Sequence, residues 1–168
     1  MPLFLPKVRF RRITDIDYGY LSNNNIKALI LDVDNTLSTH HSQTPLDGVE
    51  GWLRDMEAKG IKLLILSNSK ERRVAPFANR LKLDFLSMGC KPLPFGLIRA
   101  KRKLGFKASE TAMVGDQIFT DMMGANICGL HTILLEPIQL EDGTSFKVRR
   151  RLEKRFIAKY ERKHENGC

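Results

Sequence analysis

The sequence predicts an α/β fold, a three-layer sandwich in which a parallel sheet lies between two layers of helices. Apolar strand-like segments alternate along the chain with helix-like segments, an order typical of βαβ units. The segment 26–31 shows no alternation of polar and apolar residues, as expected for a strand that is covered on both faces. Ligands of such sheets bind beyond the carboxyl ends of the strands, so polar residues that follow strands are candidate site residues.

The elements after this first strand follow from periodicity and from the residues that end them. Residues 46–59 predict a helix, because Val49, Trp52, Leu53 and Met56 form one apolar stripe and Gly60 ends the pattern. A second strand is expected at 61–66, which is apolar apart from Lys62. Residues 70–81 then predict a helix that contains Pro76, which we expect near a kink.

The alternation continues to residue 135. We expect a short strand at 83–86, a helix over 95–104 that Gly105 stops, and a strand at 111–114. A helix over 118–128 follows, and a strand at 131–135 is expected to close the sheet.

Length and composition predict one domain over 1–168, with its core at about 26–135. The chain is 42% hydrophobic and has no Pro/Gly/Ser-rich linker. Its three cysteines, Cys90, Cys128 and Cys168, form no C-x-x-C pair, which argues against a disulfide framework and a zinc site. A secretory signal and a membrane-spanning run are not evident, so we expect a cytoplasmic protein, with peripheral contact on the inner face of a membrane as the further option.

The net charge of +9 is concentrated at the two ends of the chain. Residues 1–12 contribute +4 and residues 147–163 contribute +7, so the rest carries −2. A basic segment at 1–20 and a basic C-terminal helix over about 144–163 are therefore the expected electrostatic contacts, with a membrane, with nucleic acid or with solvent alone. Within the first segment, Leu3, Phe4 and Leu5 suit shallow insertion beside anionic head groups.

Polar residues that can carry chemistry follow four of the expected strands. Asp32 and Asp34 follow 26–31, and Asn35 and Thr36 come next with turn-forming and hydrogen-bonding groups. The later strands are followed by Ser67 and Asn68 after 61–66, by Lys91 after 83–86, and by Gly115-Asp116 with Asp121 after 111–114. Carboxylates grouped at one sheet edge can hold a divalent cation. Taken singly, each of these residues also fits a turn, a surface charge or, for Asp121, a first-turn helix carboxylate.

Together, these residues resemble the motifs of the haloacid dehalogenase superfamily. The motif D-x-D-x-T is matched by Asp32 to Thr36, the hydroxyl motif by Ser67, the lysine motif by Lys91, and G-D-x-x-x-x-D by Gly115 to Asp121. The resemblance spans 26–135 and implies a Rossmann-like core sheet. It also implies a phosphoric monoester hydrolase that works through an aspartyl-phosphate.

The resemblance further implies a role for each matched residue. Asp32 is the nucleophile and Asp34 the general acid and base, and Mg²⁺ is bound by Asp32, Asp116 and the backbone carbonyl of Asp34. Phosphate is bound by Ser67, Asn68 and Lys91, and the supporting residues are Thr36, Gly115 and Asp121. His40 and His41 follow the first motif and either contact substrate or lie exposed in a loop.

The short intervals between motifs leave no room for a cap domain. Asp32 to Ser67 holds one loop and one helix, and Lys91 to Asp116 holds one helix and one strand. An open site suits a phosphate carried on something large. By its length, this uncapped layout and the Leu-Pro start before the first strand, the chain also resembles the YqeG-type subfamily IIIA phosphatases, which are similar to mitochondrial phosphatidylglycerophosphate phosphatases.

This second resemblance implies removal of the terminal phosphate of phosphatidylglycerophosphate at a membrane surface, in phospholipid biosynthesis. The alternatives are a phosphatase for nucleic-acid ends or phosphoproteins, and a non-catalytic module that binds RNA or a ribonucleoprotein through its basic tail. Several carboxylates that repel one another at one site argue against the module. The sequence indicates no oligomeric state.

Overall fold

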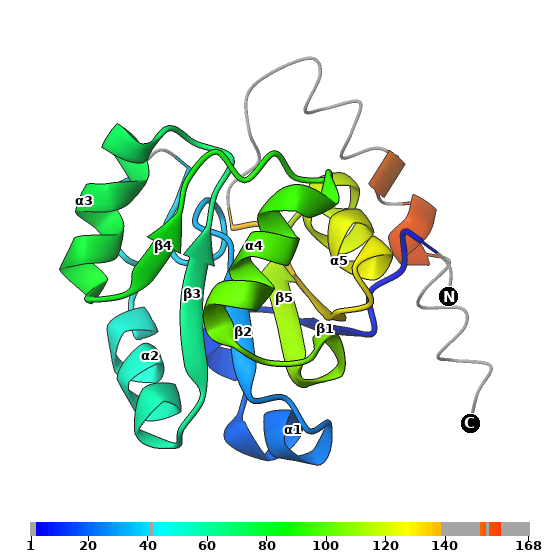
Figure 1. The fold of residues 1–168 in the computed structure, drawn as a ribbon, viewed down its shortest axis with the longest axis horizontal. Coiled ribbons are helices and arrows are strands. Elements are labelled where there is room, and N and C mark those ends of the chain that lie inside the picture. Colours follow the sequence, from blue (N-terminus) through cyan, green and yellow to red (C-terminus); the bar gives the residue numbers. More distant parts are fainter. Residues whose placement is uncertain (1–2, 41, 139–151, 154, 159–168) are drawn as a thin grey trace.

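The computed structural model describes residues 3–40, 42–138, 152–153 and 155–158. These residues form a six-stranded sheet in the order β1-β6-β5-β2-β3-β4, and every neighbouring pair of strands is parallel (Figure 1). The strands are β1 (Val8–Phe10), β2 (Ala28–Leu31), β3 (Lys62–Leu66), β4 (Asp84–Leu86), β5 (Thr111–Gly115) and β6 (His131–Leu135).

Helices cover both faces of this sheet. One face packs against α1 (Tyr18–Asn23), α2 (Val49–Ala58) and α3 (Glu71–Leu81), and the other packs against α4 (Pro94–Leu104) and α5 (Met123–Ile127). Alternate residues of β2 point to opposite faces, so Leu29 and Leu31 join one core cluster and Ile30 joins the other. The predicted α/β sandwich is confirmed, and the residues that the structure describes form no cap domain.

The expected helices and strands between 26 and 135 are present, most with ends shifted by a few residues. Gly105 ends α4 in the left-handed conformation, at φ 80°, as its position in the sequence indicates. The segment 118–128 is helical but not a single α-helix, because it begins with a π-helical turn at Ile118–Met122 before α5.

The expectation that 131–135 closes the sheet is wrong. β1 pairs with the outer side of β6, so the strand at the edge comes from the basic N-terminal segment. A 3-10 turn (Ile13–Asp15) and α1 follow β1. All three residues of β1 are half-buried, as is usual at an edge, and Arg9 interrupts the apolar pattern that would have revealed the strand.

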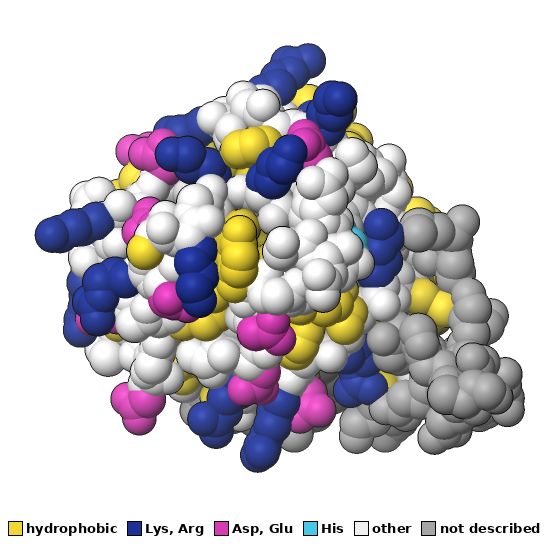
Figure 2. All heavy atoms as spheres, turned by 90° about the horizontal axis from the view of Figure 1, so that it is seen from below, with side chains coloured by type: hydrophobic (Ala, Val, Ile, Leu, Met, Phe, Trp, Pro, Cys, Tyr) yellow, Lys and Arg dark blue, Asp and Glu magenta, His cyan; other side chains and the backbone are white. Residues whose placement is uncertain are grey.

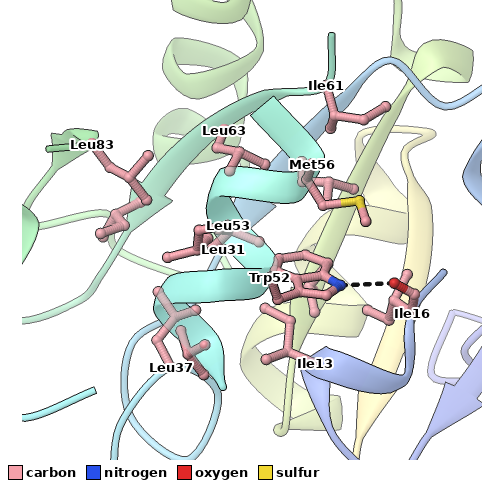
Figure 3. Packing of buried hydrophobic residues seen from close by; sticks show 14 of the residues in the cluster. Ile13, Ile16, Leu31, Leu37, Trp52, Leu53, Met56, Ile61, Leu63 and Leu83 are labelled. Carbon is pink, nitrogen blue, oxygen red and sulfur yellow. Dashed lines mark hydrogen bonds between the residues drawn. The ribbon is translucent and has the colours of Figure 1, made fainter. Parts of the chain in front are cut away.

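The core on the α2 side includes the N-terminal segment. Trp52 of α2 lies against Ile13 and Ile16, and its indole Nε1 donates a hydrogen bond of 2.8 Å to the Ile16 carbonyl oxygen (Figure 3). The bond satisfies the polar atom of a buried aromatic side chain. It also fixes the chain that connects β1 to α1 against α2.

Two of the three residues proposed for membrane insertion pack against the protein instead. Leu5 is buried, and the Phe4 ring packs against Phe119 and Phe156, with ring centroids 5.6 and 5.0 Å away. Phe156 belongs to the expected C-terminal helix, of which 152–153 and 155–158 are described and helical; the rest of 144–163 lies outside the described residues. None of the described helices combines the length and the hydrophobicity that a membrane span requires.

The face seen from below in Figure 2 carries side chains of both charges, intermixed, with small apolar areas between them. This face includes the amino ends of the strands and α1, opposite to the carboxyl ends where candidate site residues are expected. The mixture of charges agrees with a domain body that is close to neutral once its basic ends are set aside.

Candidate active site

The parallel register of three strands brings the predicted site residues to one edge of the sheet. Leu31 of β2 lies opposite Ile65 of β3 and Val114 of β5. The residues that follow, Asp32, Ser67 and Asp116, therefore leave neighbouring strands at nearly the same level, and the loop after β4 adds Lys91. Separate βα turns thus converge as the motif spacing predicts.

Three of the carboxylates form one buried cluster with a lysine. One oxygen each from Asp32, Asp116 and Asp121 lies within 4.8 Å of the others. The Lys91 ammonium donates to Asp32 Oδ1 at 2.6 Å and lies 2.7 Å from Asp121 Oδ1. All four residues are buried. Burial strengthens these interactions, because little water screens the charges.

The electrostatics of the cluster follow from its burial. Loss of solvation raises the pKa of Asp32 from 3.8 to about 7; Lys91 opposes this rise and Asp121 adds to it. Burial likewise raises the pKa of Asp121. Burial lowers the pKa of Lys91, but Asp121 and Asp32 outweigh it and raise that pKa above its ordinary value.

A hard divalent cation fits this set of donors. The cluster offers carboxylate oxygens only, and three acids share one buried place beside one ammonium group, so a cation would reduce their mutual repulsion. Mg²⁺ prefers such oxygen ligands together with water and phosphate oxygens. Two residues of the predicted ligand set, Asp32 and Asp116, lie in this cluster together with Asp121.

Gly115 makes room for Asp121. A Cβ atom at position 115 would lie 2.3 Å from Asp121 Oδ2, closer than any non-bonded contact allows. The same oxygen accepts a hydrogen bond from the Gln117 backbone N–H at 3.2 Å. The π-helical turn and the missing side chain together let Asp121 fold back to Lys91.

The Asn68 side chain holds the main chain of Lys91. Its Nδ2 donates to the Lys91 carbonyl oxygen at 2.9 Å, and its Oδ1 accepts from the Lys91 N–H at 2.7 Å. Ser67 is buried, and its Oγ accepts from the Ser69 N–H at 3.1 Å. Thr36 is also buried, in the turn after Asp34. Asn68 therefore aligns Lys91, and its predicted contact with phosphate stays a prediction.

Asp34 faces a different group of side chains. Both of its carboxylate oxygens accept from the Arg73 guanidinium, whose Nη1 is 3.0 Å from Oδ2 and also donates to Ser69 Oγ at 2.6 Å. His40 Nδ1 lies 3.6 Å from Asp34 Oδ1, while His41 lies outside the described residues. Arg73 is not among the predicted site residues. Its spacing of four from Ser69, at the start of the helix after Ser67, was the available signal.

Two further features near the site come from the ends of the chain. The Glu153 carboxylate accepts a 2.9 Å hydrogen bond from the backbone N–H of Ile118, at the start of the π-helical turn. A cavity of about 170 Å³ beside Asn35 and Thr36 is also lined by Arg11 and Arg12, which follow β1. No pattern in the sequence pointed to these contacts, because they join segments that are distant along the chain.

Comparison with known proteins identifies the family. Residues 38–129 match the model of the haloacid dehalogenase-like hydrolases. Probable phosphatase YqeG of Bacillus subtilis is 34% identical over 160 residues, which cover 95% of this chain and 93% of that protein. The chain belongs to the haloacid dehalogenase-like hydrolases. The resemblance inferred from the motifs is thus confirmed.

Other similarities in this family are more distant. Phosphatidylglycerophosphate phosphatase 1, chloroplastic/mitochondrial, of Arabidopsis thaliana is 25% identical over 95% of this chain, which spans 49% of that protein. The crystal structure of 4-nitrophenylphosphatase from Thermotoga maritima superposes with a TM-score of 0.60 at 12% identity, over 71% of this chain and 89% of that one. The latter similarity is one of fold. The family match and the 34% identity to the Bacillus subtilis protein make the chain an enzyme, a phosphatase of the haloacid dehalogenase type.

Proposed function

We propose that this chain is a Mg²⁺-dependent phosphomonoesterase that removes the terminal phosphate of phosphatidylglycerophosphate at a membrane surface. The observation that carries the phosphatase chemistry is the buried group of Asp32, Asp116 and Asp121, of which Asp32 and Asp121 contact the Lys91 ammonium. Phosphate monoesters hydrolyse very slowly unaided, and a catalyst must align a nucleophile and neutralise the charge on phosphorus-bound oxygens.

Asp32 is the proposed nucleophile. Its carboxylate attacks phosphorus to form an aspartyl-phosphate, and the bond to the leaving oxygen breaks. Lys91 balances the negative charge of the phosphoryl group, Ser67 donates a hydrogen bond to it, and Asp121 keeps Lys91 in place. Asp32, Asp116 and the Asp34 carbonyl would hold Mg²⁺, which would supply the positive charge that reduces the repulsion between the carboxylate and the phosphate.

Asp34 moves the proton in this proposal. Its carboxyl group protonates the leaving alkoxide and then takes a proton from the water that hydrolyses the aspartyl-phosphate. In the structure the Asp34 carboxylate is held by Arg73, so this ion pair has to open when substrate binds. The released guanidinium is then available for a second anionic group of the substrate, such as a phosphodiester.

Three observations support a lipid-borne phosphate. Among the described residues no cap domain covers the site, which suits a large substrate. Arg11 and Arg12 follow β1 at the same edge of the sheet and are exposed, which favours an anionic surface. The Arabidopsis thaliana relative, of which this chain spans about half, is named a phosphatidylglycerophosphate phosphatase. Oligonucleotides and phosphoproteins also fit an open site and are included in the test.

The test measures phosphate release from a panel of substrates with Mg²⁺ or with a chelator. The panel holds phosphatidylglycerophosphate in detergent micelles, a 5′-phosphorylated oligonucleotide, a phosphopeptide, a sugar phosphate and an aryl phosphate. We expect Mg²⁺-dependent release that is fastest from the lipid. Asp32→Asn should lower the rate by a factor on the order of 10⁴, whereas Asp55→Asn, which changes an exposed carboxylate on α2, should not.

Two results would contradict the proposal at different levels. Absence of Mg²⁺-dependent release from every substrate would refute the phosphatase mechanism. Release that is at least as fast from the oligonucleotide or the phosphopeptide as from the lipid would refute the lipid assignment and leave the mechanism standing.

A further inference from the structure

Three large apolar side chains project into solvent beside the buried Lys91. Met88, Leu93 and Phe95 are 55, 53 and 66% exposed, whereas Lys91 is 6% exposed. They lie within eight residues, in the loop between β4 and α4 and the first turn of α4, at the arrowhead end of β3 and β4 (Figure 1). Single exposed apolar residues are ordinary, but three within eight residues next to a site mark an interaction surface.

The loop that carries these side chains is braced, so their exposure is built into the fold. The Met88 N–H donates to the Ser69 carbonyl at 3.0 Å, and the Gly89 N–H donates to the Ser67 carbonyl at 2.9 Å. On the other side, the first turn of α4 packs directly on the loop, because a Cβ atom at Gly96 would lie 2.1 Å from the Gly89 carbonyl oxygen. The loop is therefore held on both sides and keeps its apolar groups outward.

The charges around these side chains suit an anionic partner. Within the rim segments 67–73 and 87–99, the exposed charged residues are Lys70, Arg72, Arg99 and one acid, Glu71. Arg99 lies one helical turn from Phe95, on the same side of α4. Lys70 follows Ser69, whose carbonyl accepts from the Met88 N–H. Apolar groups flanked by cations are the pattern of a surface that enters the boundary between lipid head groups and acyl chains.

We infer that Met88, Leu93 and Phe95 dock the enzyme on the surface of an anionic phospholipid bilayer. This inference rests on the proposed lipid substrate, and it replaces Leu3, Phe4 and Leu5 as the inserting element. The apolar side chains enter the acyl boundary while Lys70, Arg72 and Arg99 contact the head groups. Because Lys91 lies in the same loop, docking brings the site to the depth at which a head-group phosphate is presented.

Fluorescence of a tryptophan placed at position 95 tests this docking. The single native tryptophan, Trp52, is buried and gives a constant background. Emission of Phe95→Trp should shift to the blue when vesicles of phosphatidylcholine with phosphatidylglycerol are added, and should be quenched by lipids brominated on the acyl chain. The matched control is Ile127→Trp, at a site that is 50% exposed on α5, and its emission should not shift.

Vesicle sedimentation measures the contribution of the side chains. Leu93→Ser with Phe95→Ser should weaken binding to anionic vesicles by on the order of tenfold for each side chain, and Phe95→Ser alone should show part of the loss. Hydrolysis of a soluble aryl phosphate and the melting temperature serve as checks of the fold, and both should stay close to the wild type. Ile127→Ser should bind vesicles as the wild type does.

Several results would overturn the inference. These are wild-type protein that does not bind anionic vesicles, a Phe95→Trp emission that vesicles leave unchanged, and serine variants that bind as well as the wild type. A change from dimer to monomer in the serine variants would instead assign the surface to a second copy of the chain. Failure of the proposed function is separate, because it appears as absent hydrolysis of phosphatidylglycerophosphate in micelles, where no bilayer is needed.

Discussion

Replacing the proposed nucleophile should stabilise the metal-free protein. Asp32 is buried beside Asp121, and its pKa rises from 3.8 to about 7 in the folded state. A carboxyl group whose pKa is higher folded than unfolded binds its proton more tightly when folded, so its contribution to stability falls as pH rises from about 4 to about 7 and stays low above that. This decrease in the free energy of unfolding amounts to at most about 4 kcal/mol.

Asp32→Asn removes this cost and keeps an oxygen that can accept from Lys91. In urea unfolding with a chelator, the variant should therefore be more stable than the wild type at pH 8, and the difference should shrink toward pH 5. Added Mg²⁺ should stabilise the wild type more than the variant, because the variant loses a ligand. A variant less stable than the wild type at pH 8 without metal would refute this reasoning.

Three further outcomes follow from the structure. Arg73→Ala removes the ion pair with Asp34 and should reduce kcat/KM for phosphatidylglycerophosphate roughly tenfold more than for an aryl phosphate, whereas equal losses would exclude a substrate contact by Arg73. Burial, and to a smaller extent Lys7, lowers the pKa of His131 from 6.5 to about 4. Between pH 6.5 and pH 4 the wild type should therefore lose up to about 3 kcal/mol of unfolding free energy that His131→Asn does not lose. Curves of unfolding free energy against pH that run parallel for the two proteins would contradict this. Trp52→Phe leaves the Ile16 carbonyl without its donor and should lower the free energy of unfolding in urea by about 1–3 kcal/mol. An unchanged urea midpoint would contradict this prediction.

The sequence was most informative where several local signals agreed. The segment 26–31 and the polar residues after it predicted both a buried strand and a site, because a parallel sheet brings the ends of its strands together. The helix after Pro94 ended at Gly105, since glycine readily adopts the left-handed conformation that a helix end requires.

What the sequence did not predict depends on long-range packing. β1 is three residues long and becomes a strand only by pairing with β6, more than 120 residues away. Phe4 and Leu5 resemble a membrane-inserting segment until the contacts with Phe119 and Phe156 are known. Arg73 shows no sign of a role until the fold brings it to Asp34, because a charged residue in the first turns of a helix is usually solvated.

We propose that the βα turns assemble one Mg²⁺-dependent centre in which Asp32 is the nucleophile. Rapid quenching of the reaction with substrate labelled in its phosphate, followed by peptide mapping, tests this claim most directly. We predict a transient acyl phosphate on Asp32 that needs Mg²⁺ and decays at the rate of turnover. Turnover without any phosphoryl group on Asp32, or with the label on another residue, would contradict the account.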